Sequence, residues 1–269
     1  MNVLRARLSQ ARHALPGLVE RTVPAATAEG AVRACRAAER SGLLTTAGYF
    51  HADDAQPAEV AAACVDLAGK LVAAGLPTRL AIKSNALDHD PSLLRAIAAA
   101  GAPLAFDAMA PSHADAILSL ARELNAGAAL PARWRRSAAD ALELRDTPCR
   151  IRLVKGEWAD PEADADDVPR AFLDLARLLA GRAAPVGVAT HDPGLAQAAL
   201  EILRDAGTPC ELEQLRGLPR RRPMTVARRL GVPVRLYHPC GPGWWPYAVD
   251  RALDRPYLPL WAARDALGF

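Results

Sequence analysis

CRIRLVKGEW, residues 149–158, is the stretch of sequence that decides the fold. Apolar residues alternate there with Arg150 and Arg152, and Gly156 breaks the run, so the pattern predicts a strand that ends near residue 155. Lys155 is one of only three lysines among 33 basic residues, which argues against a lysine placed there as a surface charge. A lysine and an arginine beside a glycine can hold a phosphate, because glycine lets backbone N–H groups approach closely. A buried strand that merely ends in a charge is the alternative interpretation.

Strand and helix patterns alternate along the chain around this stretch. The expected strands cover residues 43–50, 79–84, 103–107, 126–131, 149–155, 186–190, 209–214 and 232–238. A helical pattern follows each strand, at residues 58–74, 90–101, 112–125, 137–145, 169–179, 195–206, 224–230 and 246–253. Two further helical patterns, at 3–15 and 26–41, precede the first strand.

Eight strand–helix units in 269 residues predict an α/β fold, a (β/α)8 TIM barrel that forms a single domain. We expect an N-terminal helical segment at residues 1–42 and the barrel at residues 43–269. An open doubly wound sheet also alternates strands and helices, but the Gly-x-Gly-x-x-Gly turn that it carries after its first strand is missing. The barrel is therefore the better interpretation.

Composition and charge exclude several classes of function. The net charge is only +3, and the one dense basic run, at residues 219–223, is bracketed by prolines and interpreted as a solvated loop, so we expect no nucleic-acid partner. Five cysteines without a Cys-x-x-Cys pair indicate reduced, buried thiols and no metal site. No apolar run reaches about 18 residues and no signal-peptide pattern opens the chain, so we expect a cytoplasmic protein.

Polar residues gather where the strands end, which in a barrel of this kind is the face that carries the active site. They are Lys83, Asp107, Arg152, Lys155, Thr190, His191, Asp192, Glu213, Tyr237 and His238. The residues in the middle of the strands are expected to be small or aliphatic. Singly, each polar residue has a structural explanation: Asp107 could cap a helix, and His191 could be a structural histidine. Together they predict one functional rim.

The last helical pattern adds four polar residues to this rim. Asp250 and Arg251 follow Tyr247 by three and four positions, and Asp254 follows them by four and three, so the four residues share one helix face. A surface pair between Arg251 and Asp254, worth little to stability, is the alternative explanation for the last two.

Eight blocks of sequence, in this order, resemble the FAD-dependent proline dehydrogenases. They are LAIKSNAL (80–87), LAFDAM (104–109), ALPARWRR (129–136), RLVKGEW (152–158), ATHD (189–192), ELEQLRG (211–217), RLYHPCG (235–241) and PYAVDRALDRP (246–256). The resemblance runs from about residue 43 to residue 256. It implies a distorted (β/α)8 barrel that binds FAD and oxidises L-proline to 1-pyrroline-5-carboxylate. It also implies a quinone or other electron acceptor, and at most a weak association with a membrane.

The resemblance also implies roles for individual residues. On the cofactor side, Arg152 would lie beside the flavin, and the residues along its phosphates and adenosine would be Lys155, Gly156, Glu157 and Trp158. The pyrophosphate cradle would continue with Thr190, His191 and Asp192. Glu213 would stand on the flavin side, and Asp254 at the acidic position near the end of the last helix. On the substrate side, the positions around the proline ring would be those of Lys83, Asp107, Tyr237, Tyr247 and Arg251.

Three departures from the family pattern alter the substrate end of the site. Asp250 stands where the family has an arginine that grips the substrate carboxylate, and Pro131 and Glu213 stand where it has flavin-side glutamines. Asp192 also replaces the usual asparagine. Loss of one charged partner costs about 1.5–3 kcal/mol, so we expect free L-proline to be a poor substrate and another cyclic secondary amine to be preferred.

Two other interpretations remain. The departures also fit a catalytically silent barrel that acts as a binding or scaffold protein, although such a barrel has no need of Lys83, Asp107 and Tyr237. An aldolase or isomerase barrel acting on phosphate esters is disfavoured, because no glycine-rich phosphate loop follows the seventh and eighth strands.

Overall fold

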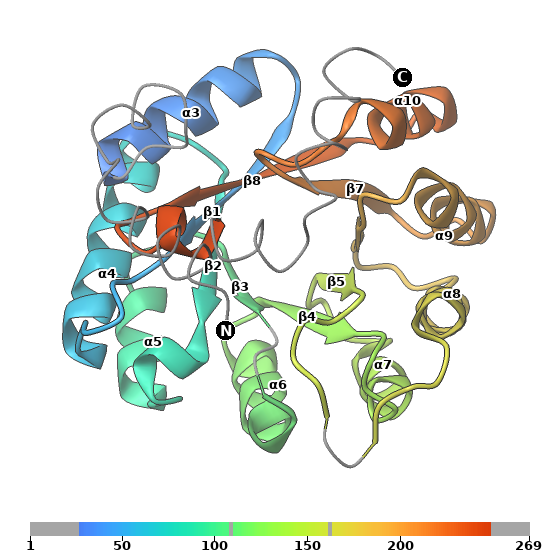
Figure 1. Cartoon of the computed structure of the whole chain (residues 1–269), viewed down its shortest axis with the longest axis horizontal. Helices are drawn as coiled ribbons and strands as arrows, with labels where there is room; N and C mark the ends of the chain where they lie inside the picture. Colours follow the sequence, from blue (N-terminus) through green and yellow to red (C-terminus); the bar gives the residue numbers. More distant parts are fainter. Residues whose placement is uncertain (1–26, 108–109, 161–162, 249–269) are drawn as a thin grey trace, which may run out of the picture.

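The computed structural model describes residues 27–107, 110–160 and 163–248, and these residues form one closed barrel of eight parallel strands (Figure 1). Each strand pairs with the next in chain order, and β1 pairs with β8 to close the ring. The strands are β1 (Leu44–Tyr49), β2 (Arg79–Lys83), β3 (Leu104–Asp107), β4 (Gly127–Pro131), β5 (Ile151–Val154), β6 (Val186–Ala189), β7 (Cys210–Leu215) and β8 (Val234–Cys240). The predicted barrel is confirmed.

The helices surround the strands, as Figure 1 shows. They are α3 (Ala28–Arg40), α4 (Pro57–Ala73), α5 (Pro91–Ala98), α6 (Ala114–Glu123), α7 (Ser137–Leu144), α8 (Val168–Leu178), α9 (Pro193–Asp205) and α10 (Arg221–Leu230), with two short 3-10 helices, η1 (Ser84–Leu87) and η2 (Pro111–His113). Residues 244–248 after β8 are also helical. The helix expected at residues 3–15 and the end of the last helix lie outside the described residues.

Several helix starts are fixed by an aspartate followed closely by a proline. Asp90, Asp167 and Asp192 cap α5, α8 and α9, and each carboxylate accepts a backbone N–H of the first turn.

The basic run at residues 219–223, which was predicted to be a loop, is partly helical. It is not wholly a loop, because Arg221 begins α10 and Pro223 sits in the first helical turn, where no N–H is needed.

The barrel closes where β1 meets β8. Their register runs from Leu44 opposite Arg235 to Tyr49 opposite Cys240. Arg235 reinforces this junction by donating through Nη1 to the carbonyl oxygen of Thr45 at 2.5 Å. On the outside, α3 buries Cys35 and other small residues next to this pair of strands.

The apolar core lies between the strands and the helices, where side chains such as Phe106, Ile151 and Phe172 are fully buried. The inside of the barrel is charged. Arg152 of β5 lies 5.5 Å from the ring of Tyr237 on β8, three strands away, so the side chains of this face point into the barrel. Arg150, two residues before Arg152 and on the same face, bonds to Glu211 across β6. The expectation of small or aliphatic residues in the middle of the strands is therefore wrong. Paired arginines and carboxylates can occupy this space because each satisfies the other's hydrogen bonds.

Gly187 on β6 makes room for this pairing. A β-carbon at Gly187 would lie 2.1 Å from Nη2 of Arg150, so only glycine leaves space for the guanidinium. Gly187 is thus a spacer that leaves room for a large charged side chain.

Candidate active site

The ion pairs inside the barrel begin at Arg235, Glu211 and Arg150. Arg235 donates to Glu211 from Nε at 2.7 Å and from Nη2 at 3.1 Å, and Arg150 Nε donates to the same carboxylate at 2.6 Å. All three side chains are buried. Burial raises the pKa of Glu211, but Arg150 and Arg235 outweigh it, so the net shift is downward and the carboxylate stays charged.

Glu213 continues the series towards the carboxyl ends of the strands. Its Oε2 accepts from Nη2 of Arg150 at 2.7 Å, and its Oε1 accepts from Nε of Arg152 at 2.6 Å. Arg152 also donates from Nη1 to Oδ1 of Asp107 at 3.1 Å. Burial raises the pKa of Glu213, but Arg152 and Arg150 more than offset this and lower it to about 2. The carboxylate is therefore charged at neutral pH.

Lys83, Asp107 and Tyr237 meet at the barrel mouth. The β2–β3 register places Lys83 opposite Asp107, with Nζ 3.5 Å from Oδ2. Lys83 donates to the hydroxyl oxygen of Tyr237 at 3.1 Å, and that hydroxyl donates to Asp107 at 3.4 Å. Burial, followed by the charge of Asp107, raises the pKa of Tyr237 well above its ordinary value. The phenol is thus a hydrogen-bond donor and not a base at neutral pH.

The aromatic ring of Phe50, which the sequence pattern did not single out, covers one side of Lys83. Its Nζ lies 3.9 Å from the ring centroid of Phe50, which is a cation–π distance. Phe50 contacts Trp244 and Tyr247, each with ring centroids 5.1 Å away. Tyr247, which was expected near the substrate, donates its hydroxyl to Glu157 at 3.1 Å. The one available signal for Phe50 was its position at the end of the first strand.

The ends of β5 and β6 carry the residues expected along the cofactor phosphates. Lys155 lies 4.0 Å from Asp192, and both side chains are about half exposed, at 45% and 51%. Trp158 is 47% exposed. Gly156 has a φ of 95° and sits so close to Pro131 and Arg133 that a β-carbon would lie 2.9 Å from each. Backbone shape and packing therefore both require glycine at this position.

Thr190, His191 and Asp192 are held by contacts within the fold. Nδ1 of His191 donates to the carbonyl oxygen of Pro219 at 2.7 Å, and Nε2 accepts from the backbone N–H of Leu215 at 3.1 Å. Asp192 caps α9, and its N–H donates to Thr190 Oγ1 at 3.2 Å. The geometry here is that of a structural histidine, which was the simpler interpretation of His191, and of a helix cap at Asp192.

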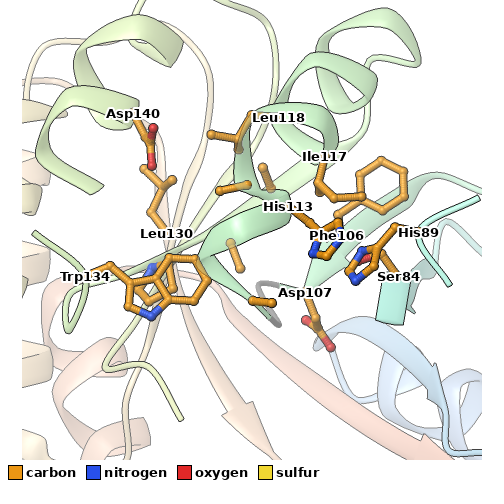
Figure 2. A pocket seen from close by; sticks show the side chains of 15 residues that line it. Ser84, His89, Phe106, Asp107, His113, Ile117, Leu118, Leu130, Trp134 and Asp140 are labelled. Atoms are coloured by element: carbon orange, nitrogen blue, oxygen red, sulfur yellow. The ribbon is translucent and has the colours of Figure 1, made fainter. Parts of the chain in front are cut away.

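A pocket lies beside Asp107, between the outer face of β3 and β4 and helix α6 (Figure 2). Its lining is mostly apolar, with Phe106 and Leu130 from the strands and Ile117 from α6. His89 and His113 stack at its edge, with ring centroids 3.7 Å apart and planes at 4°. Burial and the neighbouring His113 lower the pKa of His89, which favours the neutral form of the His89 ring.

Three predicted site residues, Asp250, Arg251 and Asp254, lie outside the described residues. Within the described part of the chain, no cluster of three or more His, Cys, Asp or Glu side chains is placed to hold a metal ion. None of the described helices is both long and apolar enough to cross a bilayer.

No protein-family model matches the chain. Individual relatives do. Proline dehydrogenase 1 of Bacillus subtilis subsp. natto is 27% identical over 263 residues, covering 88% of this chain and 86% of the relative. The proline dehydrogenase of Deinococcus radiodurans is also 27% identical, over 91% of this chain and 89% of its own. The chain is related to the proline dehydrogenases.

The resemblance to proline dehydrogenases in the sequence is thus confirmed, and solved structures agree on the fold. The structure of proline utilization A (PutA) from Bdellovibrio bacteriovorus matches 88% of this chain with a TM-score of 0.73 at 17% identity. PutA from Corynebacterium freiburgense matches 98% of the chain with a TM-score of 0.72 at 18% identity. This chain spans about a third of either PutA chain, 32% and 34%.

Proposed function

We propose that this protein is a flavin-dependent dehydrogenase that oxidises proline or a related cyclic secondary amine to an imine at the barrel mouth. The observation that carries the proposal is the hydrogen-bonded group of Lys83, Asp107 and Tyr237 at the carboxyl ends of β2, β3 and β8, with Arg152 bonded to Asp107. The proposal is also supported by sequence comparison, because relatives of this chain are named proline dehydrogenases.

The donor set at the ends of β5 and β6 fits FAD. Lys155 offers a half-exposed ammonium for a phosphate, and the exposed indole of Trp158 offers a stacking surface for adenine. When bound, FAD would supply the hydride acceptor. Glu213 fits it less well than an amide would, because both carboxylate oxygens are already bonded to arginines.

The residues at the mouth would bind and orient the amine. Asp107 presents a charged carboxylate to the ring N–H, and Tyr237 presents a hydroxyl whose raised pKa keeps its proton. Lys83 adds a positive charge beside both. Hydride transfer needs the reacting carbon held about 3–3.5 Å from its acceptor, so positioning is the main task of these side chains.

The absorption spectrum of the purified protein tests this proposal. The protein is expected to be yellow, or to become so with added FAD, and the colour should bleach under anaerobic conditions with at least one cyclic amine. Proline, prolinamide and pyrrolidine form a matched series, because they share the ring and differ in the carboxylate that Asp250 would repel. A protein that binds no FAD, or whose flavin none of the three reduces, contradicts the proposal.

A barrel that binds a partner without catalysis remains the second candidate. The local contacts of His191 and Glu213 favour it, since both side chains are occupied by protein groups. The same spectra separate the two: bound but unreduced flavin supports the silent barrel.

A further inference from the structure

Glu213 links the ion pairs at the base of the barrel to those at its mouth. One carboxylate oxygen binds Arg150 and the other binds Arg152, and the side chain is only 2% exposed. Both oxygens therefore hold guanidinium groups. A side chain so placed acts on a ligand through the arginine that it holds.

Two carboxylates balance the positive charge of the Arg152 guanidinium. Its Nε bonds to Glu213 and its Nη1 bonds to Asp107, so two carboxylates face one guanidinium. This arrangement fixes the direction of the guanidinium and cancels its charge at the mouth.

The bonded set as a whole carries one positive charge in excess. Its members are the cations Lys83, Arg150, Arg152 and Arg235 and the carboxylates Asp107, Glu211 and Glu213. Lys83 stands at the mouth end of the set, and its two other neighbours, the Tyr237 hydroxyl and the Phe50 ring, are neutral. Lys83 therefore brings to the mouth a positive charge that one carboxylate, Asp107, opposes.

We propose that Glu213 is a positioning residue for Arg152, and that Lys83, which faces one carboxylate where Arg152 faces two, supplies more of the positive charge that a bound hydride acceptor meets. The proposal rests on the proposed function for its ligand. The Glu213 part is a statement about this chain alone and can be tested without any flavin.

The first test measures the reduction potential of bound FAD in two variants that change the charge in opposite directions. Glu213→Gln removes a negative charge and should favour reduction tenfold or more, which is about 30 mV for a two-electron couple. Lys83→Met removes the excess positive charge and should disfavour reduction by a similar factor. Glu123→Gln is the matched control, because Glu123 accepts from an arginine Nε in the same way but is exposed.

The second test follows the arginine Nε–H signals by ¹⁵N NMR in the flavin-free protein. The Nε–H of Arg152, assigned by its loss in Arg152→Lys, should be sharp and slow to exchange because Glu213 holds it. In Glu213→Gln it should exchange at least tenfold faster, whereas in Glu123→Gln only the Arg95 signal should change. This result would stand even if the protein bound no flavin, so failure of the proposed function and failure of this inference are distinguishable.

Glu213→Gln should still fold, because Arg150 keeps Glu211 and Arg152 keeps Asp107. Glu213→Asp is the second variant: it keeps the charge but is one methylene shorter. It should lose the protected Arg152 signal while the flavin potential stays within about 10 mV, a factor of roughly two. An unchanged Arg152 signal in both variants overturns the positioning role. Equal shifts of potential in the same direction for Glu213→Gln and Lys83→Met overturn the charge assignment.

Discussion

The hydroxyl of Tyr237 on β8 occupies the space that a β-carbon on Gly48 of β1 would fill, at only 1.9 Å from its ideal position. The two strands are hydrogen-bonded neighbours across the closure of the barrel. Gly48 is therefore the residue that lets Tyr237 reach Lys83 and Asp107.

Gly48→Ala should displace the Tyr237 ring and break its bonds at the mouth. Overpacking of a buried site costs about 1–3 kcal/mol, so the urea midpoint should fall, and substrate-dependent flavin reduction should slow. Gly69→Ala is the control: Gly69 lies on α4 with nothing within 4 Å of an added β-carbon, so it should be neutral or stabilising. Equal stability of Gly48→Ala and the wild type would show that the space between Gly48 and the Tyr237 ring can accept a methyl group.

Lys83→Ala should leave FAD bound and slow its reduction by roughly 10²-fold, the scale for loss of one electrostatic group at a reacting centre. The reason is the position of its ammonium, 3.1 Å from the Tyr237 hydroxyl and 3.5 Å from Asp107. Anaerobic stopped-flow absorbance measures the reduction rate. Lys70→Ala serves as control, because Lys70 pairs with exposed carboxylates on the outer helices. A rate unchanged from the wild type would give Lys83 a structural role only.

Stability should fall in acid through Glu213. The folded pKa of this group is about 2, below its ordinary value of 4.5, because Arg152 and Arg150 outweigh the effect of burial. A carboxyl group with a lowered folded pKa stabilises the native state above its unfolded pKa and loses that contribution as pH falls towards the folded value. The window is therefore from about pH 4.5 down to about pH 2. The melting temperature, measured from pH 7 to pH 2, should fall less steeply across that window in Glu213→Gln than in the wild type. Parallel curves of melting temperature against pH for the two proteins would contradict the ion pairing.

Asp192→Asn should keep the helix and improve anion binding. Asparagine caps a helix as well as aspartate does, so the melting temperature should hardly change. Removing the charge 4.0 Å from Lys155 should tighten ADP or FAD binding by about 2- to 5-fold, the scale of an exposed ion pair. Isothermal titration measures this. Asp167→Asn at the start of α8 is the matched cap control. Weaker binding in Asp192→Asn would mean that the carboxylate itself contacts the ligand.

The strands and their order could be predicted because local patterns specify them. Turn residues such as Gly75 and Gly101 follow the helices, and both have positive φ. The charged interior could not be predicted. Alternation of Arg150 and Arg152 with apolar residues is the same pattern that a strand with one solvated face would show, and only closure of the barrel turns that face inward.

The mouth of the site shows the same limit. Lys83 and Asp107 could be identified because each ends a strand in the sequence itself. The aromatic cover could not, since Phe50 and Trp244 become neighbours only through the pairing of β1 with β8. Likewise, the carbonyl of Pro219 and the N–H of Leu215, which bond to the His191 ring, are backbone groups and carry no residue-specific signal.

The pairing of β1 with β8 also determines when the barrel can close during synthesis of the chain. Thr45 and Arg235, which hydrogen-bond across it, are 190 positions apart in the chain. At about 5–20 residues per second, a ribosome would finish β1 roughly 10–40 seconds before β8 emerges. Through that interval both edges of the growing sheet lack their final neighbour, and contacts of such long range form slowly. β8 is thus the strand that completes both the barrel and the candidate site at its mouth, so a nascent chain has no assembled site until β8 has emerged.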